Sequence, residues 1–299
     1  MRVLVVDIGG TYIKYACMDE AMRFLERGRT DTPQDSRESL IEAIGRLYDR
    51  LLPLDGIAIA MPGIIDVEEG CCRMGGALRY NDGFYLRRSL YQRCPVRICM
   101  ENDAKCAAMA EAAAGSLRDV DDGFVLIFGT MIGGGYIKDR RLHRGKHFSA
   151  GEVSYIATLR DGPADYNTVW GNRCGTPRLC RMYAEQKGLD PGKVDGLQVF
   201  EAVNRRDAAA LDCLERFTRE IAVQIFNLQT ILDVERFAIG GGISAQPVFI
   251  QSVREQLQEL YRRCPYQVSR AQVVTCAFRN DANLIGALQC FLGENAHFS

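Results

Sequence analysis

The sequence predicts an α/β protein, and three observations support this fold class. Short runs rich in Val, Ile and Leu, typical of strands, alternate with longer amphipathic runs typical of helices. Each half of the chain begins with a strand, a glycine turn and a returning strand, as in VVDIGGTYIKY and LIFGTMIGGGYIK. At 299 residues the chain exceeds one typical domain, so we expect two lobes.

The first half is expected to contain four strands and two helices. A helix over 35–52 begins at Asp35 or Ser36, and Glu38 is placed to support a capping box. A small-residue helix starts at Asn102 or Asp103 and ends at Gly115. The predicted strands are 2–8, 12–19, 56–61 and 96–101.

The second half repeats the opening pattern and then becomes mainly helical. Residues 149–191 are expected to be irregular, except for a helix with Thr176 as N-cap and Pro177 in its first position. We assign 1–117 to an N-terminal lobe, 118–280 to a C-terminal lobe, and expect 281–299 to pack back on the first. The predicted strands are 124–128, 135–139, 235–239 and 272–278, and the predicted helices are 207–233, 246–261 and 281–292.

Composition excludes several functional classes. The formal net charge of −1 provides no basic surface for nucleic acid. No run of 18 apolar residues is present, and Met1 and Arg2 lead straight into the strand-like VLVVDI, unlike a signal peptide. We therefore expect a cytoplasmic protein that binds neither nucleic acid nor membrane.

The twelve cysteines are scattered and form no C-x-x-C pair. This usage is typical of free, buried thiols in a reducing compartment. A less favoured alternative is that Cys71 with Cys72, or Cys174 with Cys180, oxidise or bind a metal. We expect no disulfides.

Three glycine-rich turns indicate phosphate binding. Glycine lets a turn adopt positive φ and leaves room for a ligand, while the turn's N–H groups form a concavity that binds anions. The first two turns open the matching halves, and the third, GGGIS, follows a strand and precedes a helix. Each turn alone has a structural explanation, but the three together favour a bound polyphosphate.

Four motifs resemble the ROK family of sugar kinases and related repressors, which belongs to the actin-like ATPase superfamily. They are VVDIGGTYIK, ENDAKCAAMAE, FGTMIGGGYIKDRRLHRGKHFSAGEVSY and FAIGGGIS, in the family's order. The resemblance implies two lobes, each a ribonuclease-H-like mixed sheet with helices, and an active-site cleft between them where ATP and sugar meet. It also implies a homodimer, the common state of the family.

The same resemblance implies the nucleotide site. Asp7 would face the Mg²⁺–phosphate region through water, as suits a cation that prefers oxygen ligands. Met131 stands where family members usually have glycine. The residues that resemble the first phosphate loop, the second phosphate loop and the adenosine-side loop are, respectively, Gly9, Gly10, Thr11 and Lys14; Gly129, Thr130, Gly133 and Gly134; and Gly240, Gly241 and Gly242.

The resemblance also implies the sugar site. Asp103 would be the catalytic base, and Asn102 and Glu152 would bind sugar hydroxyls. The alternative for Asp103 is a plain helix N-cap, a role that Asn102 can take instead. Gly75, Gly76 and Asn81 are either another wall of this site or part of an exposed loop.

The chain departs from the family's zinc motif. Tyr155 occupies the position of a histidine that binds zinc and touches the sugar, so recognition around the anomeric side is expected to change. Cys174 and Cys180 remain, but two thiolates do not complete a tetrahedral site. His143 and His147 lie in a glycine-containing loop. We predict no zinc.

The expected activity is ATP-dependent phosphorylation of a hexose or hexose derivative at the 6-hydroxyl. Glucose, N-acetylmannosamine and β-glucosides are the candidate substrates. One alternative is a sugar-sensing regulator without its DNA-binding domain, although the six residues before Asp7 leave no room for a helix-turn-helix. The other is a non-catalytic ATP- and sugar-binding protein, which has no chemical need for Asp103, Asp7 and Glu152 together.

Overall fold

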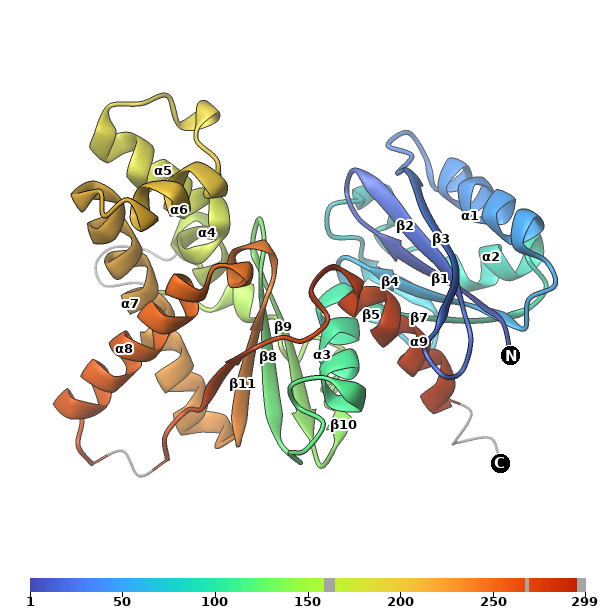
Figure 1. The fold of residues 1–299 in the computed structure, drawn as a ribbon. Coiled ribbons are helices and arrows are strands. Elements are labelled where there is room, and N and C mark those ends of the chain that lie inside the picture. Colours follow the sequence, from blue (N-terminus) through green and yellow to red (C-terminus); the bar gives the residue numbers. More distant parts are fainter. Residues whose placement is uncertain (159–164, 267–268, 295–299) are drawn as a thin grey trace. The chain divides into compact units, whose positions relative to one another are not determined.

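The computed structural model describes residues 1–158, 165–266 and 269–294, and the chain forms two compact units (Figure 1). The first unit comprises Met1–Ala114, Arg141–Ala150 and the described residues from Asn280 onward. The second comprises Gly115–Arg140 and the described residues of Gly151–Arg279. The chain therefore returns to the first unit twice, and 141–150 cluster with the first unit rather than with the rest of 118–280.

The first unit contains a sheet with the strand order β3-β2-β1-β4-β7. Strand β1 (Val3–Ile8) pairs antiparallel with β2 (Tyr12–Met18) and parallel with β4 (Gly56–Met61). Strand β4 pairs parallel with β7 (Arg97–Asn102), and β3 (Phe24–Asp31) forms the edge beside β2. Every residue of β1 and β4 is buried, as expected for central strands covered on both faces.

Helices cover both faces of this sheet. In Figure 1, α1 (Arg37–Leu51) and α2 (Leu86–Arg93) lie on one side, and α3 (Asp103–Ala114) packs with α9 (Ala282–Glu294) on the other. A Cβ at Gly286 of α9 would collide with the carbonyl of Cys106 in α3, so glycine permits this close packing. The smaller elements of the unit are β5 (Ile64–Asp66), β6 (Cys71–Met74), η1 (Arg79–Asn81) and β10 (Arg141–Leu142).

The second unit repeats the topology. Strand β8 (Gly123–Phe128) pairs antiparallel with β9 (Ile132–Lys138) and parallel with β11 (Arg236–Gly240). Strand β11 pairs parallel with β12 (Val273–Thr275), so β9-β8-β11-β12 has the arrangement of β2-β1-β4-β7. The predicted α/β class, with a hairpin opening each half, is confirmed.

Five helices and four described 3₁₀ turns complete the second unit, and η6 (Arg279–Asp281) lies where the chain leaves it. The region 149–191, predicted to be irregular apart from one helix, also contains α4 and two of these turns, and a third turn begins at Pro191. The helices are α4 (Trp170–Cys174), α5 (Thr176–Lys187), α6 (Gly196–Asn204), α7 (Ala208–Leu232) and α8 (Pro247–Arg263). The turns are η2 (Val153–Tyr155), η3 (Tyr166–Thr168), η4 (Pro191–Lys193) and η5 (Gly242–Ala245).

One predicted helix cap is confirmed, while a predicted capping box and a second cap need correction. Helix α1 is capped by Ser36, one of its two predicted caps, and the hydroxyl of Ser36 accepts from the N–H of Ser39, so the third helical position is Ser39. Glu38 is therefore one position too early for the predicted capping box. Helix α5 has Gly175, not Thr176, as its N-cap.

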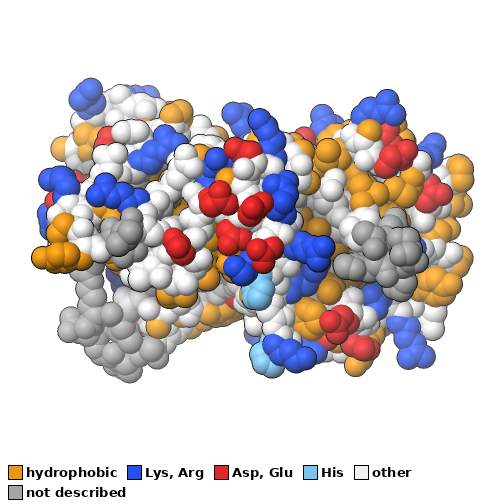
Figure 2. Space-filling view, turned by 90° about the horizontal axis from the view of Figure 1, so that it is seen from below, with side chains coloured by type: hydrophobic (Ala, Val, Ile, Leu, Met, Phe, Trp, Pro, Cys, Tyr) orange, Lys and Arg blue, Asp and Glu red, His pale blue; other side chains and the backbone are white. Residues whose placement is uncertain are grey.

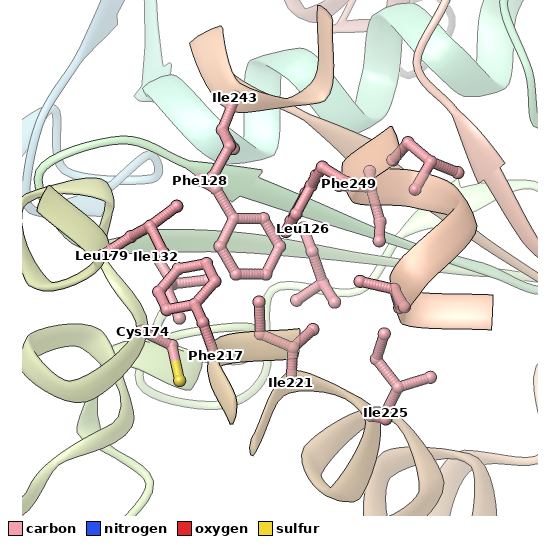
Figure 3. Close-up of a cluster of buried hydrophobic side chains, with 14 of the residues drawn as sticks. Leu126, Phe128, Ile132, Cys174, Leu179, Phe217, Ile221, Ile225, Ile243 and Phe249 are labelled. Atoms are coloured by element: carbon pink, nitrogen blue, oxygen red, sulfur yellow. The ribbon is translucent and has the colours of Figure 1, made fainter. Parts of the chain in front are cut away.

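The core of the second unit holds the end of β8 in place. Figure 3 shows the ring of Phe128 enclosed by apolar side chains that include Ile243 and Ile221. Its ring centroid lies 5.7 Å from that of Phe249 and 6.3 Å from that of Trp170, both in edge-on geometry. The glycine turn that follows Phe128 thus starts from a buried anchor.

The surface agrees with the small net charge. On the face seen in Figure 2, Lys and Arg side chains are interspersed with Asp and Glu. Among the described helices, none is long and apolar enough to cross a membrane. Eleven of the twelve cysteines are buried, and all twelve are free thiols in the structure.

Candidate functional site

Several predicted site residues of the first unit lie at one edge of its sheet. Strands β1, β4 and β7 run parallel, so their carboxyl ends share that edge, where α/β sheets commonly bind ligands. Asp7 is near the end of β1, Gly63 follows β4, and Asn102 ends β7. The structure therefore places the first glycine turn, Asn102 and Asp103 at the same edge of this sheet.

Asp7 is a buried carboxylate beside the first glycine turn. The amide of Asn283 donates to its Oδ1 at 3.1 Å, and the Nζ of Lys14 lies 3.6 Å from its Oδ2. Burial raises the pKa of Asp7, and the hydrogen bond from Asn283 and the charge of Lys14 offset only part of this effect. Because these two contacts offset only part of the cost of burying the negative charge, the carboxylate of Asp7 is suited to binding a further cation.

The first glycine turn is held by its carbonyl groups. The hydroxyl of Thr32 donates to the carbonyl of Gly9, and the side-chain amide of Gln34 donates to that of Gly10, each at 2.7 Å. The N–H groups of Gly10 and Thr11 have no hydrogen-bond partner within the described chain. This turn therefore presents two N–H groups that an anion can accept.

Asn102 and Asp103 divide two roles at the start of α3. The Oδ1 of Asn102 accepts from the N–H of Lys105 at 3.0 Å, which is the predicted N-cap bond. Its Nδ2 donates to the carbonyl of Gly63 at 2.9 Å. Asp103 is the first helical residue, is partly exposed, and accepts from the N–H of Ala104 at 2.8 Å. Because Asn102 supplies the cap, the carboxylate of Asp103 is not required for that role.

A buried ionic contact supports this helix start, and our sequence analysis missed it. Glu101 accepts from the N–H of Asn102 at 2.8 Å and from the Nε of Arg144 at 2.6 Å. The buried Nζ of Lys105 donates to the carbonyl of Phe148 at 2.7 Å. Both partners belong to 141–150, where the sequence predicts only a glycine-containing loop around His143 and His147. The one available signal was a charged residue, Glu101, at the end of an apolar strand.

Asn81 is buried, so the exposed-loop alternative for 75–84 does not hold at this residue, although several of its neighbours are exposed. The residue ends η1, and neither its Oδ1 nor its Nδ2 has a hydrogen-bond partner among the described residues. Gly75 donates to the carboxylate of Asp82 at 2.7 Å, and a Cβ there would collide with the carbonyl of Leu78. Gly76 adopts a positive φ of 61°. An unpartnered buried amide calls for a water or a polar ligand.

The second glycine turn connects β8 and β9. The N–H of Gly129 donates to the carbonyl of Met131 at 2.9 Å. The N–H groups of Thr130 and Met131 have no partner within the described chain, which matches the first turn. Gly133 and Gly134 lie inside β9, paired with residues of β8, and so are outside the turn itself.

Gly134 has a different structural role, since it positions Glu152. A Cβ at Gly134 would collide with the carbonyl of Gly151, so glycine allows the next segment to approach β9. The hydroxyl of Ser154 accepts from the N–H of Ile132 at 3.0 Å and donates to its carbonyl at 2.6 Å. Glu152 is therefore held between two points fixed against the sheet.

The residues at the zinc-motif positions, Tyr155, Cys174 and Cys180, lie in three different elements. Tyr155 is half exposed, and burial together with the negative charge of Glu152 raises its pKa. The thiol of Cys174 donates to the carboxylate of Glu220 at 3.6 Å, and Cys180 lies in α5. No group of three or more His, Cys, Asp or Glu side chains is placed to hold a metal in the part of the chain that the structure describes. The absence of zinc stays a prediction.

A cavity of about 770 Å³ adjoins the second and third glycine turns. This volume is typical of small-molecule sites. Gly241 has a φ of 88°, and a Cβ there would collide with the carbonyl of Phe128, whereas a Cβ at Gly242 would meet open space. The lining includes Gly129, Thr130, Pro177, Val194, Phe200 and Gly242.

Comparisons of the sequence and of the structure with known proteins both match the chain to members of the ROK family. The ROK family model matches residues 3–294. A β-glucoside kinase of Listeria monocytogenes is 31% identical over 300 residues, covering 99% of this chain and 100% of that protein. A β-glucoside kinase of Klebsiella pneumoniae is 31% identical over 292 residues, covering 97% and 96%. The crystal structure of a ROK family protein from Streptococcus pneumoniae in complex with sucrose is similar, with a TM-score of 0.90 at 28% identity, covering 99% and 100%.

Proposed function

The chain belongs to the ROK family and is a sugar kinase, and we propose that it transfers the terminal phosphoryl group of ATP to the 6-hydroxyl of a hexose or hexose derivative. The observation that carries the residue assignment is the division of roles at α3, where Asn102 caps the helix and Asp103 follows it. In this reaction the hydroxyl oxygen bonds to the γ-phosphorus while the bond to the β–γ bridging oxygen breaks, and ADP leaves.

Asp103 is the proposed proton acceptor. Phosphoryl transfer depends mainly on positioning and charge neutralisation, with one group needed to take the proton of the attacking hydroxyl. A carboxylate within hydrogen-bond reach of that hydroxyl meets this need. The cap from Asn102 and the contacts of Glu101 and Lys105 with 141–150 hold the start of α3, and so restrict the position of Asp103.

Asp7 and the two turns are the proposed phosphate and magnesium site. Mg²⁺ binds proteins through one or two carboxylates and keeps several waters, so a single buried carboxylate beside two unpartnered N–H groups fits a Mg²⁺–ATP complex. When bound, Mg²⁺ neutralises negative charge on the phosphates. Lys14 adds a positive charge 3.6 Å from Asp7. The N–H groups of Thr130 and Met131 would bind phosphate oxygens from the second turn.

The remaining predicted residues are assigned to the adenosine and the sugar. The cavity beside Gly242 would hold the adenine and ribose, because an apolar lining with a glycine opening suits a planar base. Glu152 and the remaining hydrogen-bonding capacity of Asn102 would bind sugar hydroxyls. Asn81 is a further candidate, since a sugar hydroxyl would satisfy its buried amide.

Glucose, N-acetylmannosamine and β-glucosides are the proposed acceptors, and the names of two relatives above 30% identity favour β-glucosides. The test is ADP formation with Mg²⁺ and ATP over a panel of glucose, mannose, fructose, N-acetylmannosamine, N-acetylglucosamine and cellobiose. Robust turnover with one sugar supports the proposal. No turnover with any of them, in protein shown to bind ATP, contradicts it and favours a sensor.

We also propose a cytoplasmic homodimer. The dimer rests on the family resemblance, and the cytoplasm on the abundance of buried free thiols, which suits a reducing compartment. Light scattering coupled to size-exclusion chromatography measures the mass directly. A monomeric mass of 33.4 kDa at micromolar concentration would contradict the dimer.

A further inference from the structure

Two exposed tyrosines lie near Glu152 in the second unit. Tyr155 ends the short turn η2 that follows Glu152, and its N–H donates to the carbonyl of Glu152 at 3.2 Å. Tyr166 begins the next described turn, η3. Their exposed fractions are 47% and 60%, although large aromatic side chains contribute most when buried. Neither ring belongs to the buried core, and both present exposed surface.

The backbone fixes the two turns beside each other. Ala157 and Val169 form an antiparallel bridge. The N–H of Thr158 donates to the carbonyl of Thr168 at 3.0 Å, and the N–H of Trp170 donates to that of Ile156 at 2.8 Å. Because Trp170 is fully buried, this pair of segments is anchored in the core. The tyrosines thus extend from a fixed support.

Side-chain contacts connect the pair to the candidate site. The hydroxyl of Tyr166 donates to the Sδ of Met131, in the second glycine turn, at 3.4 Å. The methyl group of Met131 in turn packs close to Gly171. Burial raises the pKa of the Tyr155 phenol, and the charges of Glu152 and Tyr166 add to this shift. Glu152, Tyr155, Tyr166 and Met131 therefore form one neighbourhood.

The chemistry of this neighbourhood suits a glycoside. Hydroxyl groups of a sugar donate to a carboxylate such as Glu152, while the C–H face of a pyranose ring is apolar and packs on an aromatic face. If Glu152 accepts hydrogen bonds from one sugar ring, a second ring attached to that sugar can pack on the exposed side chains of Tyr155 and Tyr166.

We propose that Tyr155 and Tyr166 form a subsite for the second ring of a two-ring glycoside whose first ring is phosphorylated. This inference rests on the proposed function, because it assumes that Glu152 binds the sugar. It makes a disaccharide or an aryl glucoside the preferred acceptor over a free hexose. It also gives a role to Tyr155 at the position where the zinc-binding histidine is replaced.

The test compares cellobiose with glucose as acceptor for the wild type and for the variants Tyr155→Ala and Tyr166→Ala. We expect the wild type to prefer cellobiose. Each alanine variant should lower the ratio of kcat/KM for cellobiose to that for glucose by about tenfold, since a lost aromatic contact is of this order. Tyr166→Phe keeps the ring and should retain most of the ratio. Tyr91→Ala, which removes an exposed tyrosine of α2, is the matched control and should leave the ratio unchanged.

Outcomes separate the inference from the proposed function. The subsite is refuted if the wild type phosphorylates glucose better than cellobiose, or if the alanine variants lower kcat/KM equally for both acceptors. Either result is still compatible with the proposed kinase activity. A wild type that phosphorylates no sugar refutes the proposed function instead. Thermal unfolding and binding of an ATP analogue check that each variant is folded, so a lost ratio is not a misfolding effect.

Discussion

Replacing Arg144 by methionine should destabilise the first unit by about 3 kcal/mol. The side chain of Glu101 is only 1% exposed, and Arg144 is the cation that contacts it, at 2.6 Å. Arg144→Met keeps the aliphatic length but leaves the carboxylate of Glu101, among the described residues, with the N–H of Asn102 as its donor, at 2.8 Å. Breaking a buried pair from one side costs about 3 to 5 kcal/mol. Because the side chain of Arg144 is 31% exposed, water can reach the vacated position, which places the expected value at the lower end.

The assay must report on the first unit alone. The single tryptophan, Trp170, lies in the second unit, so its fluorescence follows the wrong part of the chain. Native-state amide hydrogen exchange of α3, measured by mass spectrometry in increasing urea, gives the opening free energy of the helix that carries Asp103. The expected change is a loss of about 3 kcal/mol in the protection of these amides.

Arg93→Met is the matched control. Arg93 is 28% exposed and contacts Glu42 and Asp49, whose side chains are 49% and 53% exposed, so water replaces the lost contacts. Surface pairs of this kind contribute about 0 to 1 kcal/mol. Equal losses for Arg93→Met and Arg144→Met would refute the reasoning. The double change of Glu101→Gln with Arg144→Met should recover part of the loss, because the buried carboxylate that lost its partner is then neutral.

Two further predictions concern Asp7 and the third glycine turn. Burial raises the folded-state pKa of Asp7, so the ionised carboxylate destabilises the fold above the pKa of the unfolded state, and this cost disappears on acidification. Asp7→Asn should therefore be at least as stable as the wild type at pH 7, and the difference in stability should shrink toward pH 4, while kinase activity falls. Urea unfolding at several pH values measures the stability difference. A variant that is clearly less stable than the wild type at pH 7 contradicts this prediction. Gly241→Ala should cost about 2 kcal/mol or more, because its φ is 88° and its Cβ meets the carbonyl of Phe128, whereas Gly242→Ala meets open space. Thermal unfolding followed by Trp170 fluorescence compares the two, and equal stability would contradict the assignment.

The sequence predicted the central strands and the long helices well. Strands β1, β4, β8 and β11 are nearly continuous runs of apolar residues, and full burial explains that pattern. The sequence of helix α7 repeats its apolar residues with the helical period over 25 residues, a pattern that is typical of an amphipathic helix. The N-cap role of Asn102 was also predictable, because a short polar side chain precedes a run of small helix-forming residues.

The sequence did not predict the strand and the helix that are stabilised mainly by their neighbours. Strand β3 has mostly exposed, charged residues, and only its pairing with β2 identifies it as a strand. Helix α2 is short and buries only Leu86 and Leu90. Such segments lack the periodic apolar face on which sequence interpretation depends.

The candidate site shows the same division between local and long-range information. Motifs located its glycine turns and its carboxylates, since these residues adjoin one another in the chain. The contact of Glu101 with Arg144 spans 43 residues, and the burial of Asn81 depends on how a short turn packs, so neither leaves a local pattern. Gly134 illustrates a third case, because its pattern was found but its role is close packing against Gly151.

The measurement that tests the account most directly is the formation of sugar phosphate, detected by mass spectrometry, by the wild type, Asp103→Asn and Asp207→Asn. Asp207 caps α7 as a carboxylate at a helix start outside the candidate site, and Asn is an equally good cap there. The account predicts product from the wild type and from Asp207→Asn, and a loss of about 10² to 10⁴ in kcat for Asp103→Asn with ATP-analogue binding retained. Near wild-type turnover by Asp103→Asn would contradict the assignment of the base, and the absence of any sugar phosphate from the wild type would contradict the kinase itself.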